Sequence, residues 1–142
     1  MGKKKVAIYL RSSVKDSHEM QRQKELLMKK ALEQYSQEGI CFFDDDGYSA
    51  LDDKRPAFLN MLGELKEGGY DAVYAIEMRR LTASASYASE LAAELLKNGI
   101  RIFTYDKKED RMREFGEVDA VVASLLDSID IPDDEEMEDI NG

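Results

Sequence analysis

Residues 5–10 form the stretch Lys5-Val6-Ala7-Ile8-Tyr9-Leu10, an almost continuous apolar run of strand length. Such runs are typical of parallel strands that are buried on both faces of a sheet. The sequence Arg11-Ser12-Ser13 follows directly, so this predicted strand ends in a guanidinium and two hydroxyl groups. The stretch therefore indicates both the fold class and the place of a candidate site.

Further along the chain, helical and strand patterns alternate. Strand patterns cover residues 40–43, 72–76 and 100–105, and helical patterns cover residues 16–37, 56–66, 85–97 and 117–129. Parallel strands joined by right-handed helical crossovers form an open sheet with helices on both faces. We therefore expect an α/β fold with a mostly parallel sheet of about four to five strands. The acidic stretch from Asp44 to Lys54 is predicted as a loop.

Length and charge predict one domain followed by an acidic tail. The 142 residues carry a net charge of −10, which argues against a broad nucleic-acid surface. Six acidic residues and no basic residue lie in residues 132–142, and without this stretch the net charge is −4. We expect a domain over residues 1–131 and a solvated, disordered tail over 132–142, with a protein-binding or DNA-mimicking tail as the alternative.

The composition excludes several kinds of site. A single cysteine, Cys41, and a single histidine, His18, leave no internal disulfide and almost no nitrogen or sulfur ligands for a transition metal. No cofactor is expected. No apolar run reaches membrane-spanning length and the first residues lack a signal-peptide pattern, so we expect a cytoplasmic protein without membrane contact.

Arginines follow two of the predicted strands. Arg11 and Ser13 follow the first strand, and Arg79-Arg80 follow the third. Because parallel strands present their carboxyl ends at one edge of a sheet, these groups predict an anion site. The alternative is structural, with the arginines paired to the acidic residues 44–46 and the serines starting a helix. A Ser-His-Asp triad would need His18, which is expected to be an exposed residue of a first helical turn.

Several short motifs in order resemble the serine site-specific recombinases, the family of resolvases, invertases and large serine integrases. The resemblance covers residues 5 to about 127 and implies a resolvase-like catalytic domain. Its motifs are Tyr9-Leu10-Arg11-Ser12-Ser13, Ser17-x-Glu19-x-Gln21, Asp45-x-Gly47-x-Ser49, Arg55-Pro56 and Met78-x-Arg80-Leu81.

The resemblance implies a metal-free phosphoryl transfer in which Ser13 attacks a DNA phosphodiester and forms a 5′-phosphoserine link. Ser12 is the alternative nucleophile, disfavoured by its motif position. The implied partners are the DNA backbone and either a second copy, as a dimer or tetramer, or another recombinase. The other implied site residues are Arg11 and Arg80 as phosphate clamps, Asp45 and Arg55 behind them, Gln21 as an orienting group and Ser49 in the adjacent loop.

The sequence also departs from the family pattern. Arg79 stands at the position of the family's Asp, Ala83 at that of a second arginine, and Ala50 where Gly is frequent. The family continues into a long helix and a separate DNA-binding domain, whereas Pro132 and the acidic residues follow here. A second hypothesis is therefore a catalytically degenerate partner of an active recombinase. A third, a phosphoacceptor receiver-like domain, is disfavoured because the third strand ends in Ile76-Glu77-Met78 without an Asp.

Overall fold

The computed structural model describes residues 4–115, which form a five-stranded sheet in the order β2-β1-β3-β4-β5. Strands β1 to β4 run parallel, and β5 pairs antiparallel with β4. The strands are β1 (Lys5–Ser12), β2 (Ile40–Asp46), β3 (Tyr70–Ala75), β4 (Arg101–Asp106) and β5 (Arg111–Phe115). The helices are α1 (Ser17–Ala31), the 3-10 turn η1 (Gln37–Gly39), α2 (Pro56–Glu67), α3 (Met78–Leu81) and α4 (Ala85–Lys97).

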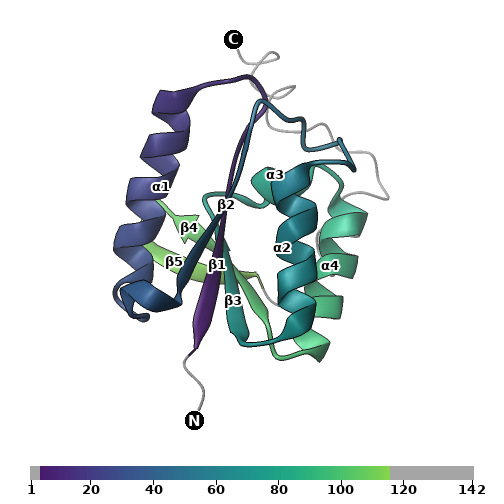
Figure 1. Cartoon of the computed structure of the whole chain (residues 1–142). Helices are drawn as coiled ribbons and strands as arrows, with labels where there is room; N and C mark the ends of the chain where they lie inside the picture. The colour runs from purple at the N-terminus through teal and green to yellow at the C-terminus, as the bar shows by residue number, and fades with distance from the viewer. Residues whose placement is uncertain (1–3, 116–142) are drawn as a thin grey trace.

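Helices cover both faces of the sheet, with α1 on one side and α2 and α4 on the other (Figure 1). The alternating side chains of β1 serve two cores, because successive residues of a strand point to opposite faces. Val6, Ile8 and Leu10 pack with the α1 residue Leu27, whereas Tyr9 belongs to the core under α2 and α4. This arrangement confirms the predicted α/β class and the helices on both faces.

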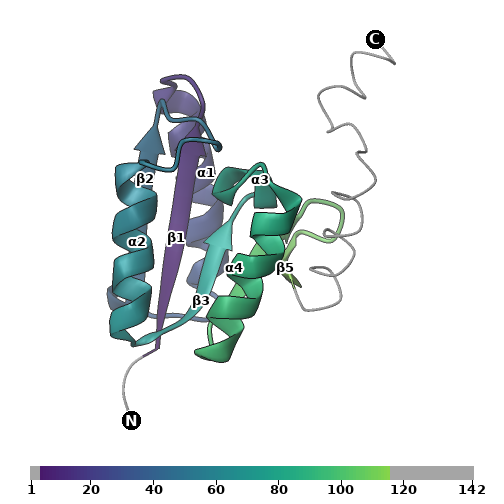
Figure 2. The same cartoon turned by 90° about the vertical axis from the view of Figure 1, so that its right-hand side faces the viewer.

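Two caps direct the chain at the carboxyl edge of the sheet, where β1 ends and α2 begins (Figure 2). Asp16 caps α1 by accepting a hydrogen bond from the backbone N–H of Glu19, as N-cap carboxylates commonly do. Asp45, at the end of β2, accepts hydrogen bonds of 2.9 Å from the backbone N–H groups of Ala57 and Phe58 at the start of α2. The same edge therefore holds the first turns of both helices.

The structure differs from the sequence predictions in four places. Helix α1 ends at Ala31 rather than near residue 37, because Tyr35 turns to the sheet, where its hydroxyl binds Asp71 and its ring packs edge-on against Tyr74. Strand β2 continues through Asp46, into the predicted loop. The sequence did not predict α3 or β5.

Two of the predictions lie outside the described residues, namely the helix over 117–129 and the domain boundary at 131 with the acidic tail. Within residues 4–115, no helix has both the length and the apolar character that a bilayer span requires.

Candidate active site

Two serines follow Arg11, and the structure places them differently. Ser12 is buried, its hydroxyl donates to the carbonyl of Val14 at 2.7 Å, and its own carbonyl accepts from the N–H groups of Gly47 and Tyr48. Ser13 is exposed directly beyond the end of β1. An attacking hydroxyl must reach its substrate, so the geometry favours Ser13 over Ser12 as a nucleophile.

The buried Arg11 ties the strand ends together. Its guanidinium donates to three backbone carbonyls, those of Arg80 (2.9 Å), Tyr48 (2.9 Å) and Arg79 (2.8 Å). A guanidinium has five N–H donors, so these bonds use only part of its capacity. Arg11 therefore fixes the loop after β2 and the turn after β3 beside the residues that carry Ser13.

Arg55, the residue directly before α2, is also buried and makes hydrogen bonds to the same region. It donates to the carbonyls of Asp52 (3.0 Å) and Leu81 (2.7 Å) and to the hydroxyl of Tyr9 (3.1 Å). The Tyr9 hydroxyl in turn donates to the fully buried Asp45 at 2.6 Å. Burial contributes most to raising the pKa of Tyr9, and the hydrogen bond to Asp45 raises this pKa further. Asp45, Tyr9 and Arg55 thus form a buried chain of hydrogen bonds behind the site.

Arg80 is held by carboxylates. Its guanidinium lies 3.3 Å from Glu19 Oε2 and 3.3 Å from Glu77 Oε1, and it donates to the carbonyl of Arg11 at 3.2 Å. The Arg80 Nε is buried without a hydrogen-bond partner among the described residues. The hydrogen bonds from Arg22 contribute most to lowering the pKa of Glu19. Together with the hydrogen bond from Gln23 and the charges of Arg22 and Arg80 they outweigh burial and lower this pKa to about 2, so the carboxylate stays ionised at neutral pH.

Four arginines, Arg11, Arg55, Arg79 and Arg80, lie close enough at this edge of the sheet for their charges to act on one another. The pKa of Arg11 is lowered mainly by burial, and the positive charges of Arg80, Arg55 and Arg79 lower it further. Such a set of preorganised donors can bind a phosphate and stabilise charge that develops on it. The predicted convergence of the strand-end arginines is therefore present in the geometry, although their catalytic roles remain a prediction.

Gln23, which was not singled out from the sequence, contacts the main chain of Arg11, whereas the predicted orienting group Gln21 does not. Gln21 is exposed and donates to Glu25 on its own helix. Gln23 is fully buried, accepts from the backbone N–H of Arg11 and donates to its carbonyl and to Glu19. The missed signal was its spacing, since Gln23 falls on the apolar face defined by Met20 and Leu27.

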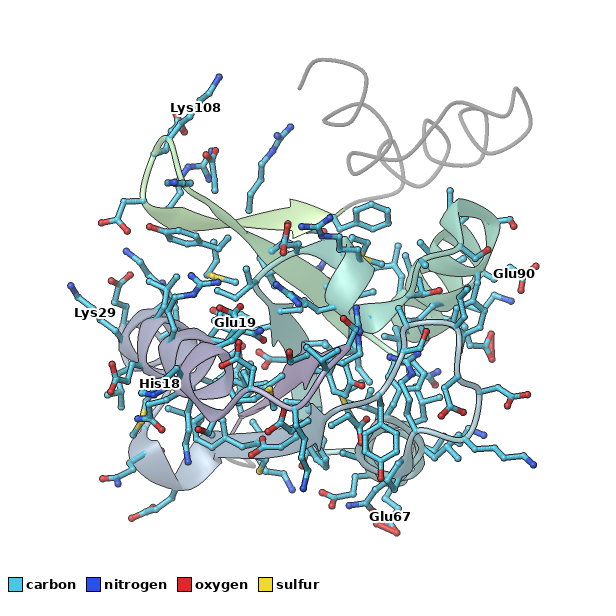
Figure 3. The ribbon with its side chains drawn as sticks, turned by 90° about the horizontal axis from the view of Figure 1, so that it is seen from above. His18, Glu19, Lys29, Glu67, Glu90 and Lys108 are labelled. Carbon is cyan, nitrogen blue, oxygen red and sulfur yellow. The ribbon has the colours of Figure 1, made fainter. Side chains whose placement is uncertain are left out.

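The remaining candidates lie at the rim of the site. Ser49 is exposed, and its hydroxyl accepts from the backbone N–H of Leu51, which shapes the loop after β2. Gly47 has a φ of +90° in that loop, a conformation that favours glycine, and its N–H meets the Ser12 carbonyl. His18 is exposed on the first turn of α1, and Figure 3 shows it farther from the sheet than Glu19.

The short helix α3 (Met78–Leu81), which carries Arg79 and Arg80, is called the arginine turn below. Two of the departures from the family pattern, Arg79 on this turn and Ala83 just after it, are near the surface. The Arg79 side chain is 46% exposed, with its Nε 3.3 Å from Glu77 Oε2. Ala83 is exposed just after α3 and carries no charge. The structure therefore contains a cation at Arg79 and none at position 83.

Comparison with known proteins agrees with this fold. The family model described as the resolvase N-terminal domain matches residues 6–131. The chain therefore belongs to the resolvase family of serine recombinase catalytic domains, which confirms the resemblance found in the sequence. No curated protein gives a match.

Solved structures share the fold at low sequence identity. The N-terminal catalytic domain of TP901-1 integrase superposes with a TM-score of 0.71 at 21% identity, covering 94% of this chain and 98% of that one. A resolvase family site-specific recombinase from Streptococcus pneumoniae gives a TM-score of 0.72 at 20% identity, over 98% and 91% of the two chains. The C-terminal catalytic domain of ISC1926 TnpA, an IS607-like serine recombinase, gives 0.63 at 19% identity, over 88% and 80%.

Proposed function

We propose that this chain is a catalytic domain that cleaves and rejoins DNA strands with Ser13 as nucleophile. The observation that carries the proposal is the exposed Ser13 hydroxyl, two residues beyond the buried Arg11 that ties the arginine turn to β1. An exposed hydroxyl that follows a fixed arginine in the chain is compatible with attack on a phosphodiester.

The reaction needs no external energy source. The Ser13 oxygen forms a bond to phosphorus, the bond from phosphorus to the 3′ oxygen breaks, and that oxygen leaves with a proton as a 3′-hydroxyl. A 5′-phosphoserine link remains, and a 3′-hydroxyl of the partner strand reverses the step. The Ser13 proton passes to water, a carboxylate or the substrate. The single histidine, His18, is exposed on α1 and is not proposed as the general base.

The arginines have different parts in this proposal. Arg80, 17% exposed and held only by longer contacts, is the residue best placed to bind the phosphate. Arg11 adds its unused donors and fixes the strand end, while Arg55 and Asp45 hold the framework behind it. Ser49 remains a candidate for a contact at the rim, and Gln21, which the sequence indicates, remains a candidate from the exposed side of α1.

We further propose that the partners are the DNA backbone and a second recombinase subunit, either a copy of this chain or another family member. Strand exchange joins ends from at least two cleaved duplexes, so more than one nucleophile must be present. The neighbours described as an integrase and as recombinases support this class of partner.

Trapping on a nicked suicide duplex tests the proposal, because loss of a short leaving fragment prevents religation. The full chain, with a resolvase-family partner included, is expected to give a covalent protein–DNA band. S13A should abolish the band that contains this chain, and S12A should keep it. Absence of the band under every partner condition would refute the proposed activity.

A second candidate is a catalytically degenerate partner that assembles with an active recombinase. It is favoured by the carboxylates that hold Arg80 and by the uncharged Ala83. Light scattering of the chain alone and mixed with a family recombinase separates the two functions. A mixed complex without any Ser13 adduct would support the degenerate partner, and an adduct from the chain itself would exclude it.

A further inference from the structure

Glu77 bridges two arginines in a way that resembles a bound anion. Its Oε1 lies 3.3 Å from Arg80 and its Oε2 lies 3.3 Å from Arg79. A carboxylate that spans two guanidinium groups occupies the place that two phosphate oxygens would take. From this geometry we infer that Arg79 and Arg80 form a two-arginine phosphodiester subsite in which Glu77 stands in for the phosphate until DNA displaces it.

The contacts of Glu77 are suited to displacement. Charge-assisted hydrogen bonds between guanidinium and carboxylate groups are typically about 2.7–2.9 Å long, and both contacts here are longer. The Glu77 side chain is 37% exposed, so a competing anion can reach it from solvent. A phosphodiester offers oxygens in a tetrahedral arrangement and can meet both arginines with shorter bonds.

Glu19 differs from Glu77 and stays in place. It receives two 2.8 Å bonds from Arg22 and one of 2.9 Å from Gln23 in addition to its contact with Arg80. It therefore keeps Arg80 at the edge of the sheet when Glu77 leaves. The unpaired Arg80 Nε adds a reason for rearrangement, since a buried donor without an acceptor is unfavourable.

The inference rests on the proposed function and adds to it. It assigns to Arg79 a direct contact with the DNA backbone, and it assigns to Glu77 control over the affinity for that backbone. The second charge on the phosphate would then come from Arg79, although Ala83 stands at the position where the family has a further arginine.

The test follows arginine side-chain signals by NMR in the full chain during titration with thymidylyl-thymidine, a dinucleoside monophosphate with a single phosphodiester. The Nε–H signals of Arg79 and Arg80 are expected to shift together with one Kd. Replacement of one nearby charge should change this Kd by about threefold to tenfold, the effect of a partly screened unit charge. E77Q should therefore tighten binding by this factor, and R79Q should weaken it by the same factor.

The Arg101–Glu114 ion pair between β4 and β5 provides matched controls. Glu114 is 37% exposed, as Glu77 is, and Arg101 is 53% exposed. E114Q and R101Q should leave the Kd within twofold, because they alter net charge to the same extent without altering the subsite.

Three results would overturn the inference: an Arg79 signal that stays still while Arg80 shifts, equal tightening by E114Q and E77Q, or no shift of either signal. The cleavage assay is independent of this titration. Shared shifts without any Ser13 adduct would contradict the proposed cleavage activity and support the phosphodiester subsite. An adduct whose formation is unaffected by R79Q would support the cleavage activity and contradict the subsite.

Discussion

The side-chain amide of Gln23 makes two hydrogen bonds to the main chain of Arg11. Its Oε1 accepts from the Arg11 N–H at 3.3 Å, and its Nε2 donates to the Arg11 carbonyl at 3.0 Å. Helix α1 thereby extends the hydrogen bonding of β1 at the last residues before Ser13. The position of the candidate nucleophile thus depends on a helix that follows it in the chain.

Replacement of Gln23 should destabilise the protein. Q23A leaves the buried N–H of Arg11 without its partner and leaves the Arg11 carbonyl with only the longer bond from Arg80, which we expect to lower the free energy of unfolding by about 1–3 kcal/mol. Urea unfolding measures this change. Q21A serves as the control, because Gln21 is exposed and its loss should cost less than about 0.5 kcal/mol. Equal effects of the two variants would contradict the assignment.

Asp45 should be the most sensitive carboxylate of the framework. D45N replaces an oxygen that accepts from Tyr9 and from the backbone of α2 in a fully buried place, so we expect a loss of about 2–4 kcal/mol in unfolding free energy. Y9F removes one of these bonds and should cost about 1 kcal/mol. The neighbouring, exposed Asp44 gives the control D44N. A similar loss in D44N would contradict the stabilising role of the Asp45 hydrogen bonds.

Stability should depend on Glu19 at acidic pH. The pKa of Glu19 is lowered from 4.5 to about 2, so its ionised form stabilises the fold above about pH 4.5, and this contribution is lost as the pH falls toward 2. The difference in unfolding free energy between the wild type and E19Q should therefore be largest above pH 4.5, at most about 3 kcal/mol, and shrink toward pH 2. E25Q on the exposed side of α1 should show no such pH-dependent difference. A constant difference between wild type and E19Q would argue against the ionised contact.

A positive charge at position 83 should increase cleavage. Ala83 is exposed and follows the arginine turn directly, so A83R adds a guanidinium near the proposed phosphate position. We expect the rate of adduct formation to rise on the order of tenfold, less than the 10²–10³-fold effect of one preorganised donor because the new side chain is not held in place. A83Q controls for side-chain length. Equal rates for A83R and A83Q would show that the charge has no part.

The alternation of apolar strands and amphipathic helices was sufficient to predict the sheet. Helix α4 begins and ends where its pattern does, because Ser84 caps the start and Asn98-Gly99 follows the end. Strand β5 could not be predicted in this way. Its sequence Arg111-Met112-Arg113-Glu114-Phe115 is mostly charged, as an edge strand tolerates, and the turn before it depends on Asp110 at a φ of +52°.

The site was only partly predictable for a related reason. Arg11 and Arg80 follow strands whose ends share an edge, so their proximity follows from topology. The partners of these arginines do not, because backbone carbonyls, Gln23 and Glu19 come into reach only through the packing of α1 and α3 against the sheet. In the structural alternative the arginines would pair with the carboxylates of residues 44–46, whereas Arg80 pairs with Glu19 and Glu77.

The most direct test of the account is the identity of the residue that carries the DNA. After trapping on the suicide duplex and nuclease digestion, trypsin releases residues 12–15 as one peptide, because Arg11 precedes it and Lys15 ends it. Fragmentation by mass spectrometry should place the nucleotide phosphate on Ser13. A phosphate on the buried Ser12, or an adduct that persists in S13A, would contradict the assignment of Ser13 as the nucleophile.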